Sequence, residues 1–340
     1  MSQLKTNNIT HLSNTGDPNI VLGDSGDVQV QSLNSGPLAG FRNQIINGNM
    51  SIWQRGTSGS TASNGFLSAD RWKRQSGGAS TNTTLSKIDS PYPGFANALR
   101  ITSTDNTNTR LRYAVELDEV GKAGRFIGTW ILSFYASSTP SDTNLAFADG
   151  SNRVNPQNWT MGTLQSLGND RYSITATAAT PAATNDCIVL SITPPGTDWN
   201  ITGIQLEPGP VATPFEHRPI GTELALCQRY YQKLNEVTGV GPVGLTQAQN
   251  TTRMVCFLPT KCTMRAAPSV GLPSTANFQL QVNDSDFGAM DFAIDQSCPS
   301  GVFVLIQPDP GNANRFTTGS SGRLFTVNAN AGSFTADAEL

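Results

Sequence analysis

Histidine, the side chain that most often moves protons in enzymes, occurs only twice in this sequence. His11 lies in a polar N-terminal stretch, and His217 stands between Glu216 and Arg218. Neither belongs to a pattern that indicates a Ser-His-Asp or Cys-His nucleophile. The sequence also contains no HExxH motif and no clustered Cys/His spacing of the zinc-binding kind. We therefore predict no catalytic residues, no cofactor and no enzymatic activity.

One glycine motif could suggest a nucleotide site. Residues 239–244 have the GxGxxG spacing, but they include Pro242 and precede no clear helix. A dinucleotide-binding loop needs a strand before it and a helix after it. We therefore do not expect a nucleotide to bind here.

An acidic run could supply oxygen ligands for Ca²⁺. Its four aspartates lie within residues 283–295 and are Asp284, Asp286, Asp291 and Asp295. The EF-hand pattern fails because Gly288 replaces an oxygen ligand and Ala289 replaces the required glycine. We predict a solvated loop and no metal, with Asp284 and Asp286 as the alternative metal ligands.

Aromatic rings can stack on the apolar faces of sugars, and the sequence has five tryptophans. Trp130 and Trp199 lie inside predicted strands, where core packing explains them. Trp159 follows the polar, turn-forming residues 155–158. Trp159 is therefore the least embedded tryptophan and a candidate surface residue for saccharide binding, although a core position is the favoured interpretation. Tyr172 is the second saccharide-binding candidate.

The composition excludes several classes of protein. Only 14% of the 340 residues are charged, and the net charge is −3, so no basic footprint for nucleic acid is present. No apolar run approaches the length that spans a bilayer, and the N-terminus has no apolar core typical of a secretory signal. The five cysteines are sparse and form no CxxC, which predicts buried free thiols.

The N-terminal segment 1–42 is polar and turn-rich. Its apolar islands, 20–22 and 28–30, are separated by the turn signal Gly-Asp-Ser-Gly-Asp. Such a segment is too short to bury a core alone. We expect an attachment or oligomerisation arm that pairs with a partner chain or scaffold, with disorder as the alternative.

Residues 43–220 predict a β-sandwich of the jelly-roll kind. Residues 110–117 alternate between two faces, as a strand with one solvent-exposed face does, and 126–136 are apolar on both faces. In the strand predicted at 199–206, Gly203 stands where the alternation changes phase, which indicates a bulge. Frequent turn signals between short strands fit this architecture.

The sequence from residue 221 onward predicts one helix followed by a second β domain. The helix is predicted over 222–234 from the spacing of Leu224, Cys227, Tyr231 and Leu234, within a linking segment 221–235. Residues 236–340 predict a sandwich-like β domain. The final stretch places Phe334, Ala336, Ala338 and Leu340 on one face of a strand that ends inside its sheet.

Several segments resemble bacteriophage tail-fibre proteins. They are residues 43–56 (NQIINGNMSIWQRG), 68–72 (SADRW), 203–209 (GIQLEPG), 212–216 (ATPFE), 218–219 (RP), 223–224 (EL), 227–231 (CQRYY), 264–268 (MRAAP) and 337–340 (DAEL). Between them, 129–136 and 171–175 are similar to strands of jelly-roll carbohydrate-binding modules. The resemblance implies a virion protein, usually a homotrimer, with a receptor-binding or structural role and no catalytic residues.

The signature has a physical interpretation as a folding motif. An aspartate beside an arginine at a domain edge can pin a loop through charge-assisted hydrogen bonds. We predict a structural role for the signature residues, with a sugar site as the alternative. They are Trp53, Arg55, Asp70, Arg71, Trp72, Glu207, Phe215 and Arg218.

These observations favour a tail-fibre-like structural protein of a phage virion that binds host-surface polysaccharide. We expect a homotrimer that contacts other virion proteins through its arm, is assembled in the host cytoplasm, and neither binds nucleic acid nor inserts into a membrane. The alternatives are a virion decoration, collar or spacer protein, or a polysaccharide depolymerase. The fixed short repeats of a β-helix depolymerase are absent from the sequence.

Overall fold

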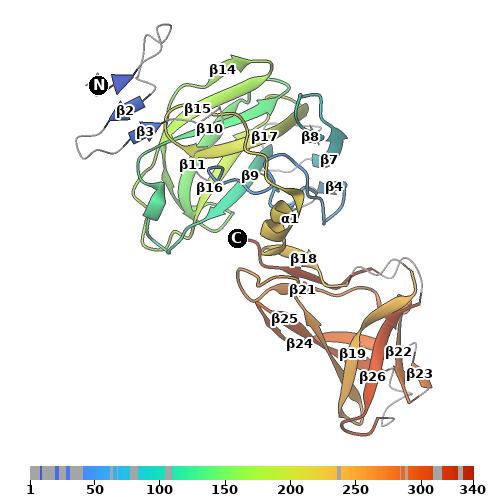
Figure 1. Cartoon of the computed structure of the whole chain (residues 1–340). Coiled ribbons are helices and arrows are strands. Elements are labelled where there is room, and N and C mark those ends of the chain that lie inside the picture. Colours follow the sequence, from blue (N-terminus) through green and yellow to red (C-terminus); the bar gives the residue numbers. More distant parts are fainter. Residues whose placement is uncertain are drawn as a thin grey trace, which may run out of the picture.

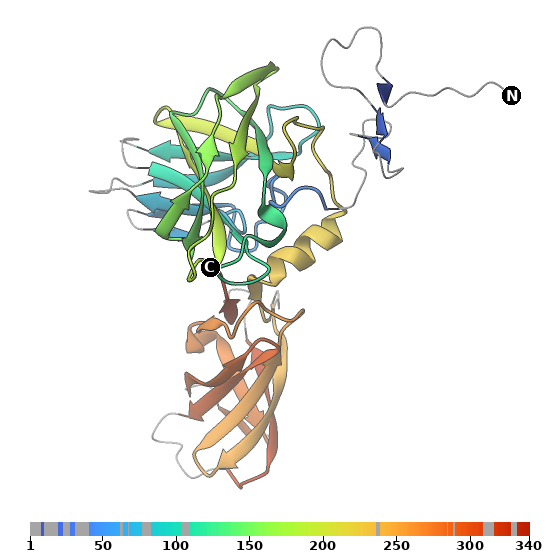
Figure 2. The same cartoon turned by 90° about the vertical axis from the view of Figure 1, so that its left-hand side faces the viewer.

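The computed structural model describes residues 8–9, 20–22, 28–30, 41–61, 64–66, 68–76, 83–103, 109–235, 239–283, 285–287, 290–308, 316–327 and 332–340. Over these residues nearly every element is a strand, and the single α-helix is α1 (Ile220–Gln228). The predicted all-β class is confirmed. A β-sandwich and a second β domain meet near α1 (Figures 1 and 2).

The sandwich consists of two antiparallel sheets. The first follows the order β13 (Thr160–Met161), β15 (Arg171–Thr177), β10 (Thr129–Ala136), β17 (Asp198–Pro208), β8 (Asn97–Ser103), β7 (Thr83–Asp89) and β4 (Ser58–Thr61), with β14 (Gln165–Gly168) also beside β15. The second follows β12 (Val154–Asn158), β11 (Asp142–Asp149), β16 (Cys187–Thr193), β9 (Thr109–Glu116), β6 (Lys73–Ser76) and β5 (Gly65–Phe66). The runs β8-β17-β10-β15 and β9-β16-β11-β12 are the two four-stranded sheets of a jelly roll.

Apolar side chains at alternate positions of the strands fill the space between these two sheets. In β9, Leu111 and Tyr113 are buried in the core, and β10 occupies an interior position of its sheet as its doubly apolar sequence predicts. Gly203 has φ +61° and lies beside a register shift between β10 and β17. A Cβ at this position would lie 2.5 Å from the Phe95 ring and 2.8 Å from Tyr135. The predicted bulge is confirmed, and it needs a glycine.

The N-terminal arm contains three short strands. They are β1 (Asn8–Ile9), β2 (Ile20–Leu22) and β3 (Val28–Val30), so both apolar islands form strands. β2 pairs with β1 and with β3, which gives a small antiparallel sheet. Pairing of this arm with a partner chain stays a prediction.

The predicted helix is shorter than expected, because its C-terminal third forms a strand. α1 ends at Gln228, and Tyr231–Lys233 form β18, which pairs with β27 (Thr335–Asp337). Tyr231 opposes Asp337 in this pairing, so tertiary hydrogen bonding overrides the helical spacing. β27 lies between β18 and β21 (Ser269–Gly271), which confirms that the final strand is interior to its sheet.

The C-terminal domain is a curled antiparallel sheet. Its order is β23 (Ser285–Phe287), β22 (Phe278–Val282), β26 (Ser321–Thr326), β19 (Gly241–Asn250), β20 (Arg253–Pro259), β25 (Gly301–Pro308) and β24 (Met290–Cys298). Phe278 of β22 packs edge-on against Phe292 of β24, with ring centroids 5.3 Å apart. The two ends of the sheet therefore face each other around one core. Gly241 and Gly244 lie within β19 instead of a phosphate-binding loop.

The cysteines are all free thiols. Cys187, Cys227 and Cys256 are buried as predicted, whereas Cys262 and Cys298 are partly exposed. Among the described residues, no helix is long and apolar enough to cross a membrane.

Candidate functional site

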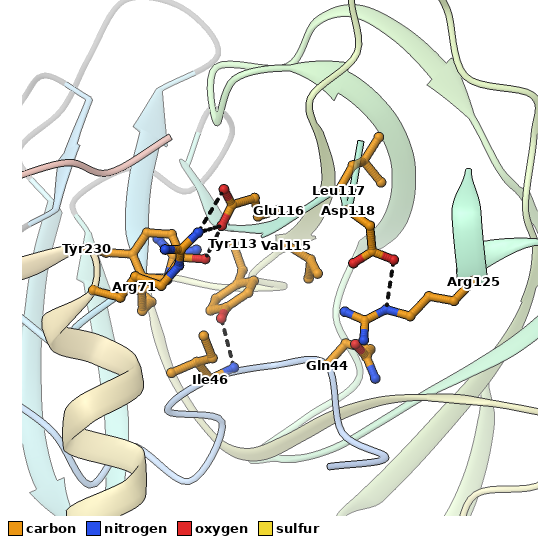
Figure 3. A pocket seen from close by; sticks show the side chains of 11 residues that line it. Gln44, Ile46, Arg71, Tyr113, Val115, Glu116, Leu117, Asp118, Arg125 and Tyr230 are labelled. Carbon is orange, nitrogen blue, oxygen red and sulfur yellow. Dashed lines mark hydrogen bonds and ion pairs between the residues drawn. The ribbon is translucent and has the colours of Figure 1, made fainter. Parts of the chain in front are cut away.

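A cavity of about 280 Å³ lies where the sandwich meets the segment that follows α1 (Figure 3). Its walls come from the loop at residues 44–46, from β9 and the segment after it, and from residues 229–230. We call it the junction pocket. It is lined by Gln44, Ile46, Arg71, Tyr113, Val115, Glu116, Leu117, Asp118, Arg125, Arg229 and Tyr230.

Hydrogen bonds between distant segments fix the inner wall of this pocket. Glu116, at the end of β9, accepts hydrogen bonds from Arg229 Nη2 at 2.9 Å and from Tyr230 Oη at 3.0 Å. Tyr113 Oη accepts one from the main-chain N of Ile46 at 2.8 Å. Three parts of the chain are thereby held together around one space (Figure 3).

The outer wall is a solvent-exposed ion pair. Arg125 belongs to the 3₁₀ turn η1 (Gly124–Phe126), and its Nε lies 3.6 Å from Asp118 Oδ2. The two side chains are 56% and 54% exposed. Exposed pairs of this kind contribute little to stability, so the groups are free to exchange this contact for a ligand.

Arg71 forms the floor of the pocket between two tyrosine rings. Its guanidinium lies 3.4 Å from the centroid of Tyr230 and 5.2 Å from that of Tyr113. Burial alone would lower the pKa of Arg71, but Glu339 outweighs it, and the pKa is raised. Burial raises the pKa of both tyrosines, so they remain neutral hydroxyl groups.

Every cation that lines the pocket has a carboxylate partner. Arg71 pairs with Glu339, Arg125 with Asp118, and Arg229 with Glu116. The pocket is therefore polar but electrically balanced. Such a lining suits a neutral ligand that carries many hydroxyl groups, because amide, carboxylate and guanidinium groups can all bond to hydroxyls.

Three signature residues, Arg55, Asp70 and Arg71, meet Asp337 and Glu339 beneath the pocket, and we call these five residues the junction network. Arg55 donates to Asp337 at 2.8 Å and to Glu339 at 3.2 Å, and Arg71 also pairs with Glu339. Asp70 accepts from the main-chain N of Gln54 at 2.9 Å. The sandwich is thereby joined to the end of the chain, and Arg55, Asp70 and Arg71 have structural partners as the folding-motif interpretation expects.

The two signature tryptophans hold the turn at residues 47–50, which lies just before Arg55 in the chain. Trp72 is fully buried and its Nε1 donates to the carbonyl of Asn47 at 3.0 Å. Trp53 donates to the carbonyl of Met50 at 2.6 Å. Both rings therefore hold the turn at residues 47–50.

The other signature residues fasten the segment that leaves β17. Glu207 accepts from the N and Oγ1 of Thr213 at 2.8 and 2.7 Å. The Phe215 ring packs edge-on against Phe95 at 5.1 Å. Arg218 pairs with Glu223 at 3.2 Å. Of the eight signature residues, Arg71 alone also lines the junction pocket.

The candidate surface role of Trp159 is wrong. Its side chain is 3% exposed, and its ring lies 5.3 Å from Phe147 and 6.4 Å from Trp130. The reason is topological. Asn158 pairs with β11 in one sheet and Thr160 with β15 in the other, so Trp159 lies where the chain crosses between sheets and its ring enters the core.

The other predicted binding residues are not brought together. Tyr172 is half-buried and stacks on Phe134 at 5.9 Å, away from the junction pocket, and its saccharide role stays a prediction. Asp284 lies outside the described residues, and Asp286 is exposed on β23. Within the described ranges, no group of three His, Cys, Asp or Glu side chains could hold a metal ion.

The pocket residues that sequence reasoning missed are Gln44, Glu116, Asp118, Arg125 and Arg229. A signal was present, because residues 116–125 place Glu, Asp, Glu, Lys and Arg close together in a chain with only 14% charged residues. Their meeting with residues 229–230 depends on tertiary structure and leaves no local pattern.

No family model matches this sequence, and neither does any curated protein. Solved structures similar to it include the enzymatically active domain of tailspike protein 4 of bacteriophage CBA120, at 13% identity and a TM-score of 0.27, covering 50% of this chain and 22% of that one. A family 11 carbohydrate-binding module from Clostridium thermocellum, in complex with a beta-1,3-1,4-mixed-linked tetrasaccharide, matches at 13% identity and a TM-score of 0.23, covering 47% of this chain and 98% of that one.

A third similar structure is the tandem CBM22 domain from Paenibacillus barcinonensis Xyn10C, at 12% identity and a TM-score of 0.28, covering 83% of this chain and 95% of that one. At these TM-scores the fold assignment rests on the strand order of the chain itself. The junction pocket is described from its own residues alone.

Proposed function

We propose that this chain is a structural, saccharide-binding protein of a phage tail fibre. The observation that carries the binding role is the junction pocket, in which three arginines are each balanced by a carboxylate around a cavity of about 280 Å³. A cavity of this size accommodates a single sugar unit. The hydrogen-bonding groups of its inner wall are held in place before a ligand arrives, which reduces the entropy lost on binding.

The tail-fibre assignment is supported by the sequence resemblance and by what the signature residues do. Two of them, Arg55 and Arg71, join the first domain to the end of the second, as a fibre that must carry load between its parts requires. A homotrimer would give avidity to weak single sites. We propose attachment to other virion proteins through the arm, and a virion location, on the same grounds.

Immobilised bacterial surface polysaccharides test the binding role. The full-length protein is compared with the double variant Asp118→Ala/Arg125→Ala, which removes the exposed wall of the pocket. The matched control is Glu119→Ala/Lys122→Ala, because this neighbouring pair is equally charged, 64% exposed at both residues and outside the pocket. Binding that the pocket variant loses and the control retains is expected. Equal binding by all three proteins would contradict a pocket site.

A rigid spacer is the second candidate function, and the junction network favours it. Four charged side chains, Arg55, Arg71, Asp337 and Glu339, tie the two domains together whether or not a ligand binds. A folded protein that binds no polysaccharide in the panel would support this role. A third outcome, release of reducing ends from a bound polysaccharide, would instead indicate a depolymerase.

A further inference from the structure

We propose that the outer face of the sheet β11-β16-β9-β6 binds the anionic groups of an acidic polysaccharide. This inference deepens the proposed saccharide-binding function, but it places the binding at a second site away from the junction pocket. We call this site the cationic face, defined by Lys73, Arg110, Arg112 and Arg153.

Strand register places these side chains on the same side of the sheet. Lys73 opposes Arg112, Arg112 opposes Ser191, and Ser191 opposes Asn144, so one row crosses four strands. Residues paired in an antiparallel ladder project to the same side of the sheet. Leu111 and Tyr113 point into the core, so Arg110 and Arg112 point outward.

Arg153 joins the row from the turn after β11. Its Nη2 donates to the side-chain oxygens of Asn144 and Asn158. The same turn also contacts Arg112 and Lys73. The main-chain carbonyl of Asn152 accepts a hydrogen bond from Arg112 at 2.7 Å, and its side-chain Oδ1 accepts one from Lys73 at 2.8 Å. This turn therefore links Lys73, Arg112 and Arg153. Arg110 completes the cluster because it lies two residues before Arg112 on the same face of β9 and repels both Arg112 and Arg153.

The hydrogen-bond partners of this cluster are neutral. Lys73 donates to Ser151 and Asn152, and Arg112 donates to Ser191 at 3.0 Å. Across the described part of the chain, none of the four cations forms an ion pair with a carboxylate, whereas all three arginines of the junction pocket do.

Burial makes this absence of carboxylate partners significant. Arg112 is 4% exposed and Lys73 is 8% exposed. A buried charge without an opposite charge is costly, and a ligand that supplies the opposite charge recovers that energy. Arg153 adds a buried Nε that has no hydrogen-bond partner.

The pKa values support this geometry. Burial, followed by repulsion from Arg153 and Arg110, lowers the pKa of Arg112 to about 10. Burial and Arg112 lower the pKa of Lys73, and Glu339 and Asp337 oppose this only in part. Both of those carboxylates are already held by Arg55 and Arg71. The pKa of Arg153 is also lowered, by burial and by Arg110. Asp142 raises this pKa, but by less than Arg110 lowers it.

The residues between the cations identify the class of ligand. Guanidinium groups bind carboxylate, sulfate and phosphate oxygens in paired hydrogen bonds. Asn144, Asn152 and Asn158 place amide groups between them, and amides bond well to sugar hydroxyls. A polysaccharide with carboxylate or sulfate substituents supplies both kinds of group.

The test compares four polymers on the full-length protein: polygalacturonate, dextran sulfate, neutral dextran and double-stranded DNA. The variant is Arg110→Ala/Arg153→Ala, which removes two half-buried cations and leaves the buried pair in place. The control is Lys87→Ala/Arg100→Ala, which removes the same charge from the other sheet. Thermal melting confirms that each protein is folded.

We expect the wild type to bind polygalacturonate or dextran sulfate and not neutral dextran, with affinity that falls as salt rises. The variant should bind about tenfold or more weakly, since each charge-assisted contact is worth roughly that factor. The preferred polymer distinguishes a carboxylate ligand from a sulfate ligand. Loss of binding in the control to the same extent, no binding by the wild type to either acidic polysaccharide, or equal binding to DNA would each overturn the proposal.

The two proposals fail separately in this design. The pocket variant Asp118→Ala/Arg125→Ala should bind the acidic polymers as the wild type does. If it loses that binding while Arg110→Ala/Arg153→Ala retains it, the cationic face is refuted and the junction pocket is supported.

Discussion

Arg71 and Glu339 lie 268 residues apart in the chain and form an ion pair in which the two side chains are only 1% and 4% exposed. Arg71 belongs to the turn before β6 of the sandwich, and Glu339 follows β27 of the second domain. The pair therefore connects the two domains, at the floor of the junction pocket. Arg71 lies in the SADRW segment and Glu339 in the DAEL segment. These two segments of the tail-fibre resemblance are therefore in direct contact.

Removing one partner of this network should destabilise the protein strongly. Glu339→Ala leaves Arg71 buried without its carboxylate, and breaking a buried pair in this way costs about 3–5 kcal/mol. Chemical denaturation measures the loss. Glu119→Ala serves as the control, because its pair with Lys122 is 64% exposed and should change stability by less than about 0.5 kcal/mol. Equal stability of the two variants would show that the network does not join the domains.

Asp70 should make stability depend on pH in the mildly acidic range. Burial, opposed by the hydrogen bond from Gln54 and by Arg55, raises the pKa of Asp70 to about 6. Because this exceeds the value of about 4 in the unfolded chain, the folded state holds an extra proton between these values. The stabilising contribution is full below about pH 4 and is lost as pH rises through about 6.

Asp70→Asn isolates this effect, since asparagine does not titrate. The free energy of unfolding of the wild type, relative to the variant, should fall by up to about 3 kcal/mol between pH 4 and pH 7. Urea titrations at several pH values measure it. Parallel stability curves for the two proteins would contradict the raised pKa of Asp70.

Deleting residues 334–340 should be poorly tolerated. The deletion removes β27, which lies between β18 and β21, together with the buried Phe334, Ala336 and Ala338. It also removes Asp337 and Glu339 and so leaves Arg55 and Arg71 unpaired. Soluble yield and circular dichroism report the outcome. A shortened chain that remains soluble, with the melting temperature of the full chain, would refute this prediction.

Trp159 should affect stability and not saccharide binding. Trp159→Ala empties a site in the sandwich core and is expected to cost about 3–5 kcal/mol. Trp159→Phe keeps an aromatic ring in place and should cost clearly less, because the indole Nε1 has no hydrogen-bond partner to lose. Denaturation and polysaccharide binding are measured on both. A binding defect in a fully stable Trp159→Ala protein would contradict this prediction.

Much of the strand pattern was predictable because it is local. The alternation around Leu111 and Tyr113, the apolar run that became β10 and the glycine bulge at Gly203 all follow from which faces of a strand are buried. The sequence resemblance also marked Arg55, Asp70 and Arg71, whose partners the structure supplies.

The incorrect predictions concern residues whose structure is determined by contacts with distant segments of the chain. Tyr231 has helical spacing from Cys227, yet its backbone pairs with Asp337, more than a hundred residues later. Trp159 has polar neighbours, yet it lies at a crossing between two sheets. The junction pocket needs Glu116 and Arg229 to meet, and no periodicity reports such a contact.

Adsorption to whole bacteria tests the central claim, saccharide binding at the junction pocket, most directly. Labelled full-length protein is titrated onto a panel of bacterial strains, with surface polysaccharide extracted from any strain that binds it as the competitor. Asp118→Ala/Arg125→Ala and Glu119→Ala/Lys122→Ala are run in parallel. We predict saturable adsorption that the polysaccharide abolishes and that the pocket variant alone loses. Adsorption that is indifferent to the polysaccharide, or that the pocket variant retains in full, would contradict the account.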